Sequence, residues 1–157
     1  MGRNAFADLP MTSRLGSLVA AVALTVAVAA CTSAPSAGPH LLVDCAAFDT
    51  EGAGGAVVER QLEAQVNQTV QITVCANPST GFSWEEPTVE GGGLEPVEHG
   101  IDQVIGVPGK DSHEVFVLRT TATGDDTIHF VYSQPWEGGE KGAWRLDVAV
   151  AVTPAGG

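Results

Sequence analysis

The side chains that could support catalysis do not form a catalytic pattern in this sequence. Ser79 lacks the setting of a nucleophile elbow. The adjacent carboxylates of Glu85-Glu86 and Asp125-Asp126 point to opposite sides of a strand or lie in a turn. The histidines lack the spacing of metal ligands, and they are His40, His99, His113 and His129. We therefore predict that the protein is not an enzyme and that it holds no metal and no cofactor.

The first 30 residues have the pattern of a signal peptide. Residues 18–30 are an almost uninterrupted run of Ala, Val and Leu, too short to span a bilayer comfortably. The run ends in Val28-Ala29-Ala30-Cys31, which resembles the lipobox of bacterial lipoproteins, where the cysteine is acylated and becomes the first residue. The alternative is an ordinary secretory signal followed by an accidental cysteine. We expect an extracytoplasmic protein that is lipid-anchored to the bacterial cell membrane through Cys31, whether translation starts at Met1 or at Met11.

Composition limits what the remaining chain can be. Residues 31–39 are rich in Ser, Ala, Pro and Gly and are expected to form a flexible tether, 40–153 one β-domain, and 154–157 a disordered tail. Without residues 1–30 the chain keeps five basic and 18 acidic side chains, a net charge near −13. This charge repels phosphate backbones and anionic lipid headgroups. We therefore expect a monomer that binds no nucleic acid and meets the membrane only through its lipid.

The other two cysteines, Cys45 and Cys75, are an even pair in a chain that is expected to be exported. Such a pair predicts a disulfide, which would close a loop of about 30 residues. A catalytic thiol would need a nearby base to form the thiolate, and no sequence pattern nominates one.

Three short segments have the composition of stiff, exposed turns. The first is Asn77-Pro78-Ser79-Thr80-Gly81-Phe82, where proline fixes φ, glycine permits a positive φ, and Asn, Ser and Thr can bond their own backbone. The second is Gly106-Val107-Pro108-Gly109, and the third, Gln134-Pro135-Trp136, places an aromatic ring among glycines and charges. By itself, the first segment could also be an ordinary connection between two strands.

The elements that hold these turns are predicted to be strands. After His40, strand signals recur about every ten residues and are bounded by Gly, Asp, Asn and Pro. The predicted strands are 40–48, 56–62, 65–74, 82–89, 94–105, 112–121, 127–132 and 144–152. Seven or eight such strands predict an all-β fold, an immunoglobulin-like antiparallel β-sandwich with Trp84 and Trp144 on strand faces. Because successive strands alternate in direction, all three turns should leave from one end.

In this order and spacing, the three turns resemble those of the chagasin family, protein inhibitors of papain-like cysteine peptidases. The family carries an Asn-Pro-Thr-Thr-Gly-aromatic loop, a Gly-x-Gly-Gly loop and an Arg-Pro-Trp loop, and the likeness covers residues 57–152. Ser79 keeps the hydroxyl of the family's Thr, and Pro108 stiffens the middle loop and removes an amide donor. Gln134 stands where the family has Arg, so the charge and the bidentate geometry of a guanidinium are lost.

The resemblance implies a reversible, non-covalent inhibitor that inserts three loops from one end of the sandwich into the active-site cleft of a papain-like cysteine peptidase. Thr80 would lie close to the catalytic cysteine, and Trp136 would dominate binding. The implied peptidase-binding residues are Asn77, Pro78, Ser79, Thr80, Gly81, Phe82, Gly106, Val107, Pro108, Gly109, Gln134, Pro135 and Trp136. One alternative is a membrane-tethered, extracytoplasmic immunoglobulin-like binding module with a non-peptidase partner, which Gln134 keeps open. Another is a purely structural envelope protein.

Overall fold

Nine strands in the described part of the chain form two sheets. The structure is a computed structural model that describes residues 34–102 and 112–156, which belong to one compact unit. The predicted signal peptide, Cys31 and the predicted turn at 106–109 lie outside the described residues. The elements are β1 (Ser36–Val43), α1 (Cys45–Thr50), η1 (Ala53–Gly55), β2 (Val57–Gln65), β3 (Gln68–Ala76), η2 (Pro78–Thr80), β4 (Ser83–Trp84), β5 (Thr88–Glu90), β6 (Leu94–Asp102), β7 (Ser112–Thr120), β8 (Gly124–Ser133) and β9 (Trp144–Thr153).

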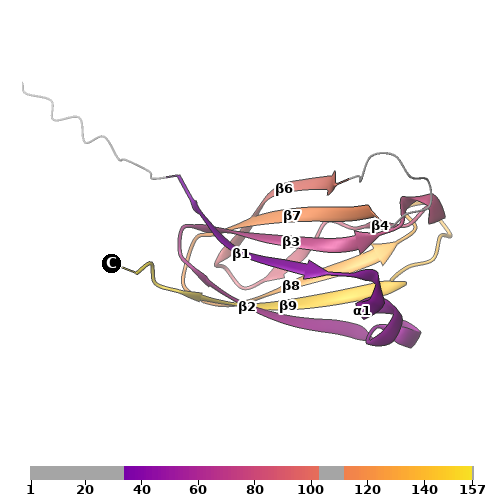
Figure 1. The fold of residues 1–157 in the computed structure, drawn as a ribbon, viewed down its shortest axis with the longest axis horizontal. Coiled ribbons are helices and arrows are strands. Elements are labelled where there is room, and N and C mark those ends of the chain that lie inside the picture. Colours follow the sequence, from indigo (N-terminus) through magenta and orange to yellow (C-terminus); the bar gives the residue numbers. More distant parts are fainter. Residues whose placement is uncertain (1–33, 103–111, 157) are drawn as a thin grey trace, which may run out of the picture. The chain divides into compact units, whose positions relative to one another are not determined.

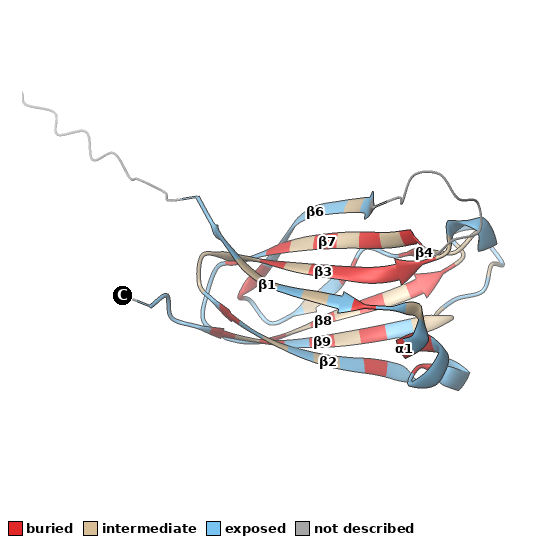
Figure 2. Cartoon of the chain, viewed as in Figure 1, coloured by how far each residue is buried: buried red, intermediate tan, exposed pale blue. Residues whose placement is uncertain are grey.

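The two sheets pack face to face around one apolar core, which confirms the predicted β-sandwich (Figure 1). One sheet has the strand order β1-β3-β7-β6, and the other has the order β2-β9-β8-β4 with β5 also paired to β8. Burial alternates along the central strands, as Figure 2 shows for β7, β8 and β9. Alternate side chains therefore fill the space between the sheets, as expected for strands with one face on the core.

Two edge pairings are parallel, so the sheets are mixed rather than wholly antiparallel. β1 runs parallel to β3, and β2 runs parallel to β9. β1 also begins at Ser36, so residues 36–39 belong to the sheet and the predicted tether is shorter than expected. The predicted strand 82–89 is divided into β4 and β5 around Pro87, which has no amide hydrogen for the ladder.

The predicted strand 40–48 is wrong beyond Val43, because Cys45 begins the short helix α1. The Asp44 side chain caps this helix by accepting a hydrogen bond from Ala47 N at 3.1 Å. The helix buries Phe48, which is 1% exposed and stacks on Trp144 with ring centroids 4.9 Å apart. A local cap and an aromatic contact thus outweigh the strand-like composition of this segment.

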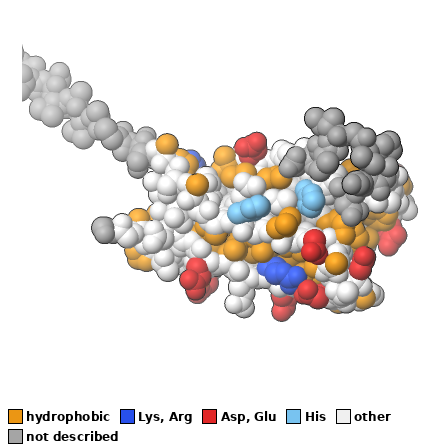
Figure 3. Space-filling model, viewed as in Figure 1, with side chains coloured by type: hydrophobic (Ala, Val, Ile, Leu, Met, Phe, Trp, Pro, Cys, Tyr) orange, Lys and Arg blue, Asp and Glu red, His pale blue; other side chains and the backbone are white. Residues whose placement is uncertain are grey.

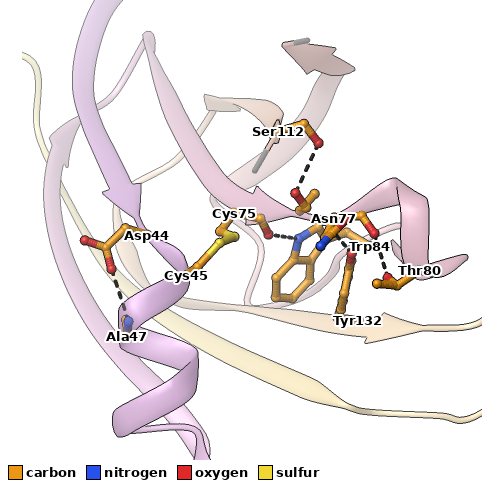
Figure 4. Close-up of a disulfide and its surroundings, with 10 residues drawn as sticks. Asp44, Cys45, Ala47, Cys75, Asn77, Thr80, Trp84, Ser112 and Tyr132 are labelled. Atoms are coloured by element: carbon orange, nitrogen blue, oxygen red, sulfur yellow. Dashed lines mark hydrogen bonds between the residues drawn. A yellow bond between two sulfur atoms is a disulfide. The ribbon is translucent and has the colours of Figure 1, made fainter. Parts of the chain in front are cut away.

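The predicted disulfide is present between Cys45 and Cys75, 30 residues apart in the chain (Figure 4). It joins the first turn of α1 to β3 two residues before Asn77. None of the helices in the described residues is long and apolar enough to cross a membrane.

A histidine links three strands on the outer face of the second sheet. His129 Nδ1 lies 2.8 Å from Asp147 Oδ1, and its Nε2 lies 3.7 Å from Glu90 Oε2. The hydrogen bond with Asp147 raises the pKa of His129 above its usual value of 6.5, against the opposing effect of partial burial, and the charges of Asp147 and Glu90 add to the rise. The protonated imidazole therefore stabilises the contacts of β8 with β9 and β5.

We predict that removing the disulfide with Cys45→Ala and Cys75→Ala together lowers the free energy of unfolding by about 3 kcal/mol, because a cross-link of this span restricts the unfolded chain. Urea unfolding of the variant and of the parent protein, each with and without reductant, measures the change. Cys31→Ser is the matched control and should leave the unfolding curve unchanged. Equal stability of the oxidised parent and the double variant would contradict the prediction.

We also predict that His129 stabilises the fold more in acid than in base. Because its folded-state pKa lies above 6.5, the contribution is complete below about pH 6.5 and is lost as pH rises through the folded-state pKa. In urea titrations, His129→Gln should cost more stability near pH 5.5 than near pH 8.5. Asp147→Asn, which removes the main partner, should flatten this pH dependence, and a pH-independent cost of His129→Gln would show that the ion pairs contribute nothing.

Candidate functional site

Two of the three predicted turns lie together at one end of the sandwich, here called the rim and defined as residues 77–82 and 134–143. Ala76 at the end of β3 is paired with Ser112 at the start of β7, and Ser133 at the end of β8 is paired with Ser83 at the start of β4. The indole ring of Trp136 packs against the first turn, since a Cβ atom placed on Gly81 would lie 2.6 Å from Cη2 of Trp136. The prediction that the turns leave from one end of the sandwich is therefore confirmed for these two.

The third predicted turn, 106–109, lies outside the described residues. Its two flanking strand ends lie at the same end of the sandwich as the rim. β6 ends at Asp102, which is paired with His113, and β7 begins at Ser112, which is paired with Ala76. The described residues thus fix the position of both strand ends from which this connection leaves.

The turn at Asn77 is held by its own hydrogen bonds. Thr80 N and Thr80 Oγ1 both donate to Asn77 O, at 3.1 and 2.6 Å, and Ser79 Oγ donates to Asn77 Oδ1 at 2.5 Å. Gly81 has φ of 79°, the left-handed conformation that glycine adopts at little cost, and its N–H donates to Pro78 O. Pro78, Ser79 and Thr80 are all exposed, so the turn is both rigid and displayed.

A set of buried polar groups holds the base of this turn, and sequence reasoning did not find it. Tyr132 Oη accepts a hydrogen bond from Asn77 N at 2.8 Å, and Trp84 Nε1 donates to Cys75 O at 2.9 Å (Figure 4). Ser112 Oγ donates to Ala76 O at 3.1 Å. Burial raises the pKa of the Tyr132 phenol above its ordinary value, while the Asn77 hydrogen bond acts in the opposite direction. Tyr132 therefore remains a neutral acceptor beneath the turn at physiological pH.

The second part of the rim presents Trp136. Its side chain is 49% exposed, in contrast to the buried Trp84. The loop is closed by Gln134, whose N–H donates to Glu140 O at 2.8 Å and whose Oε1 accepts from Glu140 N at 3.0 Å. Lys141 Nζ also donates to Gln134 O. The backbone N–H and the side-chain amide of Gln134 thus both hold the loop 134–140 closed. The sequence alone did not reveal this role.

A recess of about 240 Å³ opens at the rim between η2 and the start of β9. Stacked aromatic rings form much of it, with Tyr132 between Phe82 at 5.5 Å and Trp144 at 4.8 Å. Asn77, Thr80 and Ala143 complete the lining. The rim therefore combines a projecting turn, an exposed indole and an apolar recess, all on a rigid base.

Within residues 34–102 and 112–156, no group of three or more His, Cys, Asp or Glu side chains could hold a metal ion. Two of the described histidines instead contact carboxylates in separate places, His99 on β6 and His129 on β8. The described site offers shape and apolar surface.

We predict that Gly81→Ala displaces Trp136 and costs stability. An alanine at this positive φ is strained by about 1–2 kcal/mol, and its Cβ must also push the indole ring away. Gly54→Ala is the matched control, because Gly54 has φ of 73° but no atom within 4 Å of the added Cβ. Unfolding should show a cost in both variants, whereas the Trp136 emission should shift only in Gly81→Ala. An unchanged emission spectrum in Gly81→Ala would contradict the contact.

This chain is similar to several known proteins. Amoebiasin-2 of Entamoeba histolytica is 29% identical to this chain over 93 residues, which are 58% of this chain and 76% of the relative. The crystal structure of the cysteine protease inhibitor EhICP2 from Entamoeba histolytica superposes with a TM-score of 0.53 at 21% identity, covering 73% of this chain and 96% of that one. The structure of PbICP-C in complex with falcipain-2 gives a TM-score of 0.43 at 11% identity, over 73% and 99% of the two chains.

The family comparison covers the strands that carry the rim. The model of the chagasin family peptidase inhibitor I42 matches residues 63–150, from β2 to β9, more than half of the chain. The chain therefore belongs to the chagasin family of peptidase inhibitors.

Proposed function

We propose that this domain is a reversible, non-covalent inhibitor of papain-like cysteine peptidases, which it blocks by placing the rim in the active-site cleft. The observation that carries the proposal is the contact between Gly81 and Trp136, because it joins two separate turns into one projecting surface. Membership of a family of peptidase inhibitors supports the same function.

The turn at Asn77 is suited to fill the cleft without being cleaved. Its backbone is a 3₁₀ turn with hydrogen bonds from Thr80 N and Gly81 N, so it presents no extended peptide bond to the enzyme. Its hydroxyls are already bonded within the turn, which limits the conformational entropy that is lost on binding. In this arrangement Thr80 would lie nearest the catalytic cysteine.

Trp136 and the apolar recess would grip the wall of the cleft beside this turn. A half-exposed indole that becomes buried on association is a typical hot spot. The recess beside Thr80 would receive an apolar group of the peptidase, and 106–109 would contact the opposite wall. Gln134 cannot provide the charge of a guanidinium, so we expect it to change the affinity or the choice of target more than the mode of binding.

The alternative is an immunoglobulin-like module that uses the same rim for a non-peptidase partner. The engagement of Gln134 with Glu140 keeps this alternative open, since that side chain is turned toward its own loop. Inhibition assays with papain and cathepsin-type peptidases separate the two, because the module would inhibit none of them.

We further propose that Cys31 carries a lipid and that the domain works outside the cytoplasm. The lipobox-like segment 28–31 supports the anchor. The Cys45–Cys75 disulfide supports an oxidising compartment. Metabolic labelling of the full chain with a radioactive fatty acid, compared with Cys31→Ser, tests the anchor directly.

We predict that Trp136→Ala weakens inhibition of papain by at least about 30-fold, which corresponds to about 2 kcal/mol for a buried aromatic hot spot. The inhibition constant of the soluble domain measures the effect. Val97→Ala is the control, because Val97 is also exposed, at 57%, but lies in the first half of β6, beside Leu118 of β7 and away from the rim. An equal loss in both variants, or no loss in Trp136→Ala, would contradict the proposed mode of binding.

A further inference from the structure

The chain enters the domain at the end opposite the rim. In the parallel pairing of β1 with β3, Ser36 lies beside Gln68 at the start of β3, and Val43 lies beside Val74 near its end. Ser36 N donates to Asn67 O at 3.0 Å, which fixes the first residue of β1 at the β2–β3 turn. β3 then leads directly into the turn at Asn77. In Figure 1 the start of β1 and the η2 turn accordingly lie at opposite ends of the sandwich.

We propose, on the basis of the inhibitory function and the Cys31 anchor proposed above, that this topology points the rim away from the membrane and selects a water-soluble peptidase as the partner. A peptidase whose cleft is held close to the same membrane would not reach the rim. A soluble peptidase would approach it from the aqueous side without obstruction.

Two lengths support this orientation. The nine residues of β3 span about 26 Å, because a strand rises about 3.3 Å per residue. The five residue steps from Cys31 to Ser36 reach at most about 17 Å. The tether is thus shorter than the sandwich, so the rim could meet the lipid only if the domain lay on its side.

The distribution of charge disfavours a domain that lies on its second sheet. The outer face of the second sheet carries Glu59, Glu63 and Asp125 as exposed carboxylates, with Asp147 partly exposed among them. Glu63 and Asp125 lie near the membrane-facing end, where both are paired with Ala151, whereas Glu59 and Asp147 lie further along the same face toward the rim. In Figure 3, most of the visible carboxylates lie away from the end where the described chain begins. Anionic headgroups would therefore repel a domain that lay on the outer face of the second sheet.

Coupling to vesicles through a single thiol tests the orientation. Residues 33–157 form one compact unit, so the chain from Cys31 to Gly157 is a suitable protein, and the disulfide leaves Cys31 as its one free thiol. It is coupled to phosphatidylcholine–phosphatidylglycerol vesicles that contain a maleimide-headgroup lipid. The comparison protein combines Cys31→Ser with Glu137→Cys and is coupled beside Trp136. Each protein is compared with its own uncoupled form in papain inhibition.

Coupling through Cys31 should change the inhibition constant by less than about threefold, whereas coupling at position 137 should weaken inhibition by at least about tenfold, because the rim then faces the lipid. A large loss on coupling through Cys31, or full activity on coupling at position 137, would overturn the orientation.

A second readout does not depend on inhibition. The emission of Trp136 is obtained by subtracting the spectrum of Trp136→Phe from that of the parent protein, both coupled through Cys31. This emission should be quenched by acrylamide in water and not by a spin-labelled lipid headgroup. Quenching by the labelled lipid would overturn the orientation even if the rim inhibits papain. If neither protein inhibits papain in its uncoupled form, and only acrylamide quenches the Trp136 emission, the inhibitory function is rejected and the orientation is retained.

Discussion

The layer of aromatic side chains beneath the rim is the packing on which the rest of the structure depends. Trp144 stacks between Phe48 and Tyr132, and Trp84 packs against both Phe48 and Tyr132. These rings come from α1, β4, β8 and β9, so one cluster fixes the ends of the elements from which the rim leaves. Tyr132 adds a hydrogen bond to the backbone of Asn77, which ties the exposed turn to the core. The rim is rigid because its support is shared with the hydrophobic core and does not depend on the loops alone.

A buried carboxylate reinforces this end of the sandwich. Glu114 is 2% exposed on the inner face of β7, where an unpaired charge would be costly. Its Oε2 lies 2.8 Å from His99 Nε2 on β6, and its Oε1 accepts from Trp84 N at 3.4 Å. The His99 ring also stacks on Phe116 with centroids 4.1 Å apart. The pair joins β4, β6 and β7 near the end of the sandwich at which β6 ends and β7 begins.

The two parallel edge strands give the domain its polarity. α1 and η1 carry the chain across the rim end, from β1 in one sheet to β2 in the other, so β1 can run toward the rim and β2 away from it. The Cys45–Cys75 bond fixes this crossing to β3 just before the turn at Asn77. β1 therefore begins at one end of the sandwich, and the rim lies at the other.

The sequence by itself determined the features that depend on local chemistry. Strand alternation predicted the sandwich, Pro78 and Gly81 predicted the stiff turn, the even cysteine pair predicted the disulfide, and the exposed setting of Trp136 distinguished it from Trp84. Tertiary structure alone decided the features that join residues distant in the chain. Asn77 and Tyr132 are 55 residues apart in the chain, and Gly81 and Trp136 are separated by about as many. Phe48 lies in a helix despite the strand-like composition of its segment, because its ring stacks on Trp144. The parallel course of β1 was also beyond the sequence pattern, since alternation reports which face is buried and does not report the direction of the neighbouring strand.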